Sequence, residues 1–125
     1  MLIEWINSFF KNGNADSIFA SELHLACSET GSLELLKKAL EQESNLEVKD
    51  SAGRTALFWA IENGHLDCFE FLLQKGANPN AQDVDGVTCL NLAKSSSGLT
   101  EFSDLLLQYK ADPTLKDKHG KLYLM

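Results

Sequence analysis

The sequence reads Asp50-Ser-Ala-Gly-Arg-Thr-Ala-Leu-Phe-Trp-Ala60 near the middle of the chain, and at an offset of 33 (83 − 50) it reads Asp83-Val-Asp-Gly-Val-Thr-Cys-Leu-Asn-Leu-Ala93. Identical residues occupy five of the eleven aligned positions, among them the Asp, the Gly and the Thr of each stretch. Identity at a fixed offset indicates an internal repeat, and a repeat of this length is typical of a solenoid. The repeated unit, rather than the chain as a whole, therefore decides the fold.

The same spacing extends in both directions along the chain. Leu23-His-Leu-Ala26 precedes its counterpart in the first stretch at an offset of 34 (57 − 23), and Asp117-Lys-His-Gly120 follows its counterpart in the second at an offset of 34 (117 − 83). The later half of the unit repeats too, since Phe71-Leu-Leu-Gln-Lys-Gly-Ala-Asn-Pro-Asn80 matches Leu105-Leu-Leu-Gln-Tyr-Lys-Ala-Asp-Pro-Thr114 at an offset of 34. The repeat, with this nearly constant period, thus covers about residues 17–125.

Within a unit, the apolar residues recur at helical spacing. In the middle unit, the apolar residues from Leu57 to Ile61 share one face of a short first helix. The apolar residues from Leu66 to Leu73 form a stripe on a second helix. Gly64 lies between them and predicts the end of the first helix, because glycine most easily adopts a positive φ. Each unit is therefore predicted to be a pair of antiparallel helices.

The links between units carry turn residues. Asp83-Val-Asp-Gly86 supplies the Asp and Gly chemistry of a tight bend, so we expect each link to project as a finger. A single pair of helices leaves an apolar face bare, and stacking against the next pair covers it. The pattern predicts one stacked domain.

Two further motifs fall where a known family has them: Gly64-His-Leu66, and the run from Leu72 to Asn78 that ends in Gly-Ala-Asn. With these, the chain resembles the ankyrin repeat family. The resemblance implies an all-α solenoid of stacked helix-turn-helix units joined by β-hairpin-like loops. It implies a single domain over residues 1–125, divided into an N-terminal capping helix (1–15), repeats at 17–49, 50–82 and 83–116, and a partial repeat or cap at 117–125.

The sequence departs from the family pattern at the start of the first helices. The family's His is kept as His24 but is replaced by Phe58 and Asn91 in the next units. We expect Phe58 at the edge of its helix, where its ring could reach the binding groove, and Trp59 in the packing between helices. The family uses histidines at the positions of His24 and His65 for hydrogen bonds within and between units.

Composition excludes several classes of function. Eleven Lys and Arg against eighteen Asp and Glu give a net charge of −7, which disfavours nucleic acid as a partner. The opening residues are interrupted by Glu4 and Asn7 and lack a basic start, so they predict neither a signal peptide nor a membrane span. A membrane-surface or partner-binding helix stays the alternative to a cap there.

The cysteines favour a reducing, intracellular compartment, most simply the cytoplasm. Cys27, Cys68 and Cys89 cannot pair completely, and each is flanked by apolar residues as a small buried hydrophobe would be. His24 with Cys27 and His65 with Cys68 have the residue types of a zinc site. The two His-x-x-Cys pairs are offset by 41 (65 − 24), out of register with the repeat, so we expect them not to converge.

No catalytic or phosphate-binding motif occurs in the sequence, so we expect neither an enzyme nor a cofactor. The resemblance implies a non-enzymatic module that binds another protein through its hairpin tips and concave inner-helix face. Alternatives are an adaptor fragment of a larger protein with an enzymatic domain, and a structural protein that self-associates through Leu122, Tyr123 and Leu124; a monomer is the main expectation. The resemblance also implies that Asn80 is a candidate for hydroxylation.

The residues at the expected binding positions differ from one unit to the next, whereas Gly53, Thr55, Leu57 and their counterparts stay constant. We expect the variable positions to have no role in the core. They are Ser51, Ala52, Arg54, Glu62, Asn63, Val84, Asp85, Val87, Lys94, Ser95, Lys116, Lys118 and His119.

Overall fold

The computed structural model describes residues 21–122, so the predicted capping helix within residues 1–15 lies outside the described residues, as do Tyr123 and Leu124. The described part is all-helical and contains no strand. Its helices are α2 (Glu22–Ala26), α3 (Leu33–Gln42), α4 (Ala56–Glu62), α5 (Leu66–Gln74), α6 (Cys89–Ser95) and α7 (Thr100–Gln108). The prediction of an all-α stack is confirmed.

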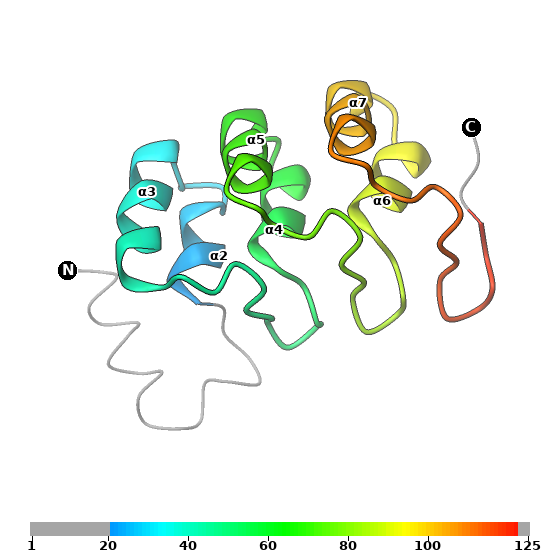
Figure 1. Cartoon of the computed structure of the whole chain (residues 1–125), viewed down its shortest axis with the longest axis horizontal. Helices are drawn as coiled ribbons and strands as arrows, with labels where there is room; N and C mark the ends of the chain where they lie inside the picture. The colour runs from blue at the N-terminus through cyan, green and yellow to red at the C-terminus, as the bar shows by residue number, and fades with distance from the viewer. Residues whose placement is uncertain (1–20, 123–125) are drawn as a thin grey trace.

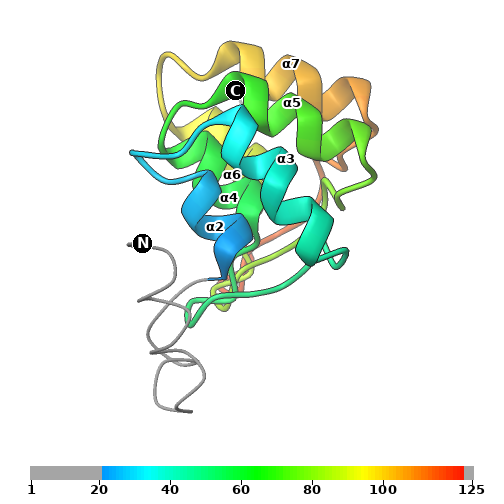
Figure 2. The same ribbon diagram turned by 90° about the vertical axis from the view of Figure 1, so that its left-hand side faces the viewer.

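The helices pair in sequence order and stack side by side. Each short helix packs against the longer one that follows it, and α4 also contacts α2 and α6 while α5 contacts α3 and α7. Figures 1 and 2 show α2, α4 and α6 in one layer and α3, α5 and α7 in a second layer, with the links between pairs projecting to one side. We call the layer of short helices the inner helices and the other layer the outer helices.

Local chemistry explains where the helices start and stop. Gly64 ends α4 with a φ of 72°, as its position between the helical stripes predicts. The hydroxyl groups of Ser21 and Thr88 accept hydrogen bonds from backbone N–H groups in the first turns of α2 and α6. The side chains of His24 and Asn91 bond back to the capping residues, which completes a capping box at each helix start.

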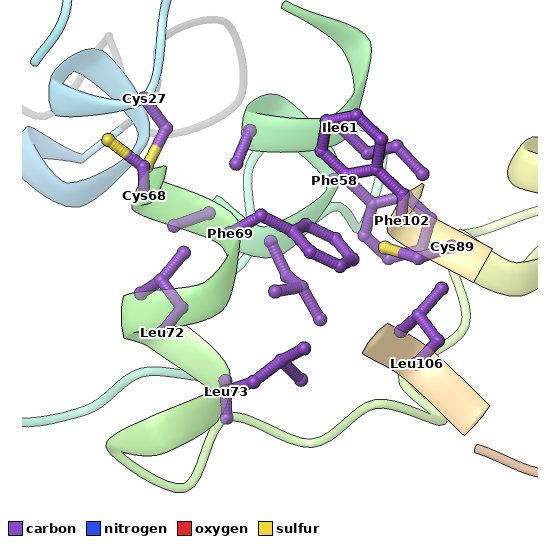
Figure 3. Packing of buried hydrophobic residues seen from close by; sticks show 14 of the residues in the cluster. Cys27, Phe58, Ile61, Cys68, Phe69, Leu72, Leu73, Cys89, Phe102 and Leu106 are labelled. Atoms are coloured by element: carbon purple, nitrogen blue, oxygen red, sulfur yellow. The ribbon is translucent and has the colours of Figure 1, made fainter. Parts of the chain in front are cut away.

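A continuous apolar core runs between the two layers. The predicted stripe of α5 is buried, with Phe69 and Leu72 fully inaccessible, and so is the stripe of α4. Figure 3 shows this packing, in which Phe69 meets Phe102 of the next pair edge to face with ring centroids 4.9 Å apart. Neighbouring pairs therefore share one core instead of each closing its own.

An aspartate closes each link in the same way. The Oδ1 atom of Asp50 accepts hydrogen bonds from the N–H groups of Ala52 and Arg54, both at 2.9 Å. Asp83 and Asp117 repeat the pattern with the residues two and four positions further on, at 2.8 to 3.0 Å. We call these three turns, residues 50–54, 83–87 and 117–121, the fingers.

Candidate partner-binding surface

Consecutive fingers are bonded to one another. The N–H of Val84 donates to the carbonyl of Ala52 at 3.0 Å, and the N–H of Lys118 donates to the carbonyl of Asp85 at 2.8 Å. A Cβ atom added to Gly86 would lie 2.7 Å from the backbone nitrogen of Lys118, so glycine is required for this approach as well as for its φ of 77°. The fingers form a connected row, which we call the finger row.

The predicted binding residues divide by exposure. The exposed ones are Ser51, Glu62, Asn63, Val84, Asp85, Ser95, Lys116, Lys118 and His119. The half-buried ones are Ala52, Arg54, Val87 and Lys94. Those on the fingers share the finger row, whereas Glu62, Asn63, Lys94 and Ser95 lie at the C-terminal ends of the inner helices α4 and α6.

Arg54 lies outside the apolar core, but its side chain makes contacts within the fold. Its guanidinium pairs with Glu62, lies 4.0 Å from the carboxylate of Asp83 and covers the ring of Phe58 at 5.8 Å from the centroid. These contacts join one finger to the next and to the helix behind it. Arg54 therefore stabilises the repeat itself.

Asn63 also lies outside the core and also makes contacts within the fold. Its amide nitrogen donates to the carbonyl of Trp59 at 2.8 Å and to the carbonyl of Cys27 at 3.2 Å. The first bond closes the end of α4 and the second crosses to the preceding helix pair. Asn63 is thus an inter-repeat contact as well as an exposed residue.

Asp85 and Lys118 form an ion pair on the exposed side of the finger row. The Lys118 Nζ lies 2.7 Å from the Asp85 carboxylate, which lowers the pKa of Asp85 and raises that of Lys118. Because both groups are exposed, salt screens the pair and it contributes little to stability. Beside it, Val84 exposes 65% of its surface at the finger tip.

The aromatic residues of α4 lie deeper than a binding role requires. Phe58 is fully buried, so the expectation that its ring reaches the groove is wrong; the equivalent His24 and Asn91 are buried as well, so this position faces inward in every described unit. Trp59 packs against the core as predicted, edge to face with His24, and its Nε1 donates to Asp50 at 2.8 Å. The indole thereby braces the first finger.

Two hollows lie along the inner helices. One, of about 420 Å³, opens between Glu62 on α4 and Leu92 on α6, and the loop at Ser96 and Ser97 completes it. The other, of about 450 Å³, includes Lys94 and Ser95 but faces the end of the described stack, next to Leu107, which is 46% exposed. Lys94 and Ser95 therefore border the end face.

Three side-chain contacts to backbone groups hold the surface in place. Nε2 of His24 lies 2.6 Å from the carbonyl of Arg54 in the first finger, and Nε2 of His65 lies 2.6 Å from the carbonyl of Ser28. These bonds agree with the roles that the resemblance implies for both histidines. The amide oxygen of Asn80 accepts from the N–H of Asp112 at 2.7 Å, a structural role that leaves hydroxylation a prediction.

The two cysteine positions do converge, against expectation. The thiols of Cys27 and Cys68 are hydrogen-bonded to each other in the core. Within residues 21–122, no group of three or more His, Cys, Asp or Glu side chains is arranged to hold a metal ion. The two cysteines meet although their offset differs from the repeat period, because they belong to different parts of the repeat. Cys27 is at the end of the inner helix α2, whereas Cys68 lies on the outer helix α5 of the next pair.

Comparison with known proteins identifies the repeat. A family model described as ankyrin repeats, in three copies, matches residues 23–117. The chain belongs to the ankyrin repeat family. Ankyrin repeats generally serve as modules for protein–protein interaction. Among residues 21–122, no helix combines the length and apolar character needed to cross a membrane.

Several known proteins are similar to this chain over part of their own length. The chain is 36% identical over 104 residues to the B-cell lymphoma 3 protein homolog of Mus musculus. This alignment covers 82% of the chain and 23% of that protein. It is 33% identical over 122 residues to the E3 ubiquitin-protein ligase KEG of Arabidopsis thaliana, covering 95% of the chain and 7% of that protein. The crystal structure of the ankyrin repeat domain of Bcl-3, described as a unique member of the IkappaB protein family, matches with a TM-score of 0.74 and 36% identity. That match covers 82% of this chain and 45% of the Bcl-3 chain.

Proposed function

We propose that this ankyrin repeat chain is a non-enzymatic module that binds a partner protein through the finger row and the inner-helix face. One observation carries the proposal: Ser51, Val84 and Lys118 occupy equivalent tip positions on three fingers of the same backbone geometry, and all three are exposed. Side chains that differ on a constant, hydrogen-bonded frame are what a recognition surface needs, because a preorganised backbone lowers the entropy cost of binding.

The side chains on the row indicate the partner's chemistry. Val84 offers an apolar contact, and the adjacent Asp85 and Lys118 offer both signs of charge. We infer a partner surface with complementary mixed charge around an apolar side chain. Its association rate should fall as salt rises, since charges at the rim steer the encounter.

Site-specific photo-crosslinking tests this surface. A photoreactive amino acid at Val84 or Lys118 should crosslink the partner in cells, whereas the same group at Glu70 or Asp104, both exposed on outer helices, should not. With the crosslinked protein purified, Val84→Glu and Asp85→Lys should each weaken its binding about tenfold or more. The melting temperature of each variant should stay within a few degrees of the parent.

The control variants are Glu70→Lys and Asp104→Lys, which change charge by as much but lie away from the finger row. If they abolish binding while the finger variants leave it unchanged, the assigned surface is wrong. Arg54→Glu is a poor probe, because a carboxylate there would face Glu62 and Asp83 and destabilise the fold.

Two alternatives have support of their own. The similarity to part of an E3 ubiquitin-protein ligase supports an adaptor segment within a larger enzyme. The exposed Leu107 beside the hollow at the end face supports self-association. Light scattering over a concentration series tests self-association. A monomer mass that stays constant contradicts it. A mass that rises with concentration in the parent chain, and is restored to that of the monomer by Leu107→Glu, supports it.

A further inference from the structure

Cys27 and Cys68 come from different repeats and are offset by 41 in the sequence (68 − 27), yet their side chains meet in the core. Both residues are completely buried, and their thiols are hydrogen-bonded to each other. Figure 3 shows the side chains of Cys27 and Cys68 next to each other where the chain leaving α2 contacts the start of α5. Both are free thiols.

Two hydrogen bonds hold the backbones on either side of this contact. The carbonyl of Cys27 itself accepts from the Asn63 amide at 3.2 Å, and the carbonyl of Ser28 accepts from His65 Nε2 at 2.6 Å. Asn63 and His65 flank the turn that leads into α5. The two thiols are thus kept in register by contacts between the same two repeats.

The two thiols differ in chemical character. Cys68 is the third residue of α5, where the helix dipole favours a thiolate, although its N–H is bonded to Asp67 and that carboxylate and burial oppose ionisation. The hydrogen bond from Cys27 also lowers the pKa of Cys68, while the same bond and burial raise the pKa of Cys27. Cys68 is therefore the group that ionises first and attacks first.

We propose that Cys27 and Cys68 form a disulfide site that ties the first repeat covalently to the second when a small-molecule disulfide of the glutathione class is present. The Cys68 thiolate attacks one sulfur of that disulfide and displaces one small thiolate, leaving a mixed disulfide on Cys68. Cys27 then loses its proton, attacks the Cys68 sulfur and displaces the second small thiolate. Two electrons pass from the protein thiols to the small disulfide, and the two released thiolates take up the two protons.

Access to the buried pair comes from local opening. Helix α2 has five residues and is the first described helix, so the described part of the stack covers it from one side. Short elements with few buried residues open more readily than the long helices of the core, and opening of α2 would expose Cys68 to the oxidant. The bond formed would then oppose that same opening, because it closes a long loop in the unfolded chain.

Peptide mapping of the full chain tests the site directly. The three cysteines fall into three tryptic peptides, residues 12–37, 55–75 and 76–94. After equilibration with excess oxidised glutathione, we expect the intact chain to lose the mass of two hydrogen atoms. Peptide 12–37 should be joined to peptide 55–75, while peptide 76–94 keeps a free thiol, because burial raises the pKa of Cys89.

The oxidised chain should melt at least about 5 °C higher than the reduced chain. Cys27→Ala should lose both the joined peptide and the shift, and Cys89→Ala should retain both. Three outcomes would overturn the proposal: thiols that stay free, glutathione adducts without the joined peptide, or crosslinks that involve Cys89. The map of the unsubstituted chain decides the matter even if a variant fails to fold.

Discussion

At the scale of single residues, one imidazole joins the first helix to the first finger. The Ser21 N–H donates to Nδ1 of His24 at 3.0 Å, so the proton of the neutral ring is on Nε2, which donates to the carbonyl of Arg54. Burial lowers the pKa of His24, although the Arg54 carbonyl and the nearby charge of Asp50 partly oppose this. The fold therefore requires the neutral ring.

This requirement makes stability depend on pH. The unfolded chain takes up a proton at His24 near the ordinary pKa of about 6.5, whereas the folded chain takes it up only at lower pH. The contribution of His24 to the free energy of unfolding should be fully present above about pH 6.5 and be lost as pH falls toward the lowered pKa. Urea midpoints at about pH 7.5 and about pH 5.5 would measure it.

The matched variant is His24→Asn, because Asn91 occupies the equivalent position and caps its helix without an imidazole. It should cost about 1 to 3 kcal/mol at neutral pH, since the carbonyl of Arg54 loses one of its two partners and keeps only the N–H of Asp50. The part of the stability that is lost at acid pH should also be smaller in this variant. His119→Asn, on an exposed finger, should keep the full acid loss. If His24→Asn loses as much unfolding free energy between the two pH values as the parent chain does, His24 is not the source of the pH dependence.

At the scale of structural elements, the fingers show why the repeat retains its Asp and Gly. The aspartate closes each turn internally, and the glycine lets the next finger approach. Gly86 and Gly120 have the same φ of 77°, but only Gly86 has a following finger against it. A Cβ on Gly120 would meet nothing within 4 Å in the described structure.

The two glycines separate conformational strain from contact between fingers. Gly120→Ala should cost about 1 to 2 kcal/mol, the usual penalty of a left-handed conformation for alanine. Gly86→Ala should cost about 1 to 3 kcal/mol more, because its methyl group would overlap the backbone at Lys118. Chemical denaturation of both variants tests this, and equal losses would mean that the finger row is not a rigid unit.

At the scale of the whole molecule, the contacts between helices in residues 21–122 join neighbouring pairs. Helices α4 and α5 have a described helix pair on both sides, whereas α2 and α7 have a described helix pair on one side. In such a solenoid, the stability of a unit follows the number of its neighbours. The ends should therefore open before the middle.

Hydrogen exchange measures this order. The amides of α4 and α5 should exchange most slowly, and those of α2 and α7 should exchange about tenfold or more faster. A stack that opens only as one cooperative unit would instead give the same protection in all six described helices. That result would also remove the route by which the buried cysteine pair meets its oxidant.

The period of the repeat, the helix pairs and the turns at Gly64 and Gly86 could be predicted from the amino-acid sequence. These features depend on residues close together in the chain, whose apolar spacing and φ preferences carry the information. The sequence also indicated that the finger positions vary, and the row of Ser51, Val84 and Lys118 follows from the register of the repeat.

The contacts that these residues make could not be predicted in this way and follow from the folded arrangement. It buried Phe58, paired Arg54 with Glu62, bonded Asn63 to the preceding repeat and brought Cys27 against Cys68. Each of these contacts joins different elements, and their partners depend on how one helix pair is shifted and rotated against the next. The packing of large side chains such as Phe69 and Phe102 sets that arrangement, and a local pattern of residues does not encode it.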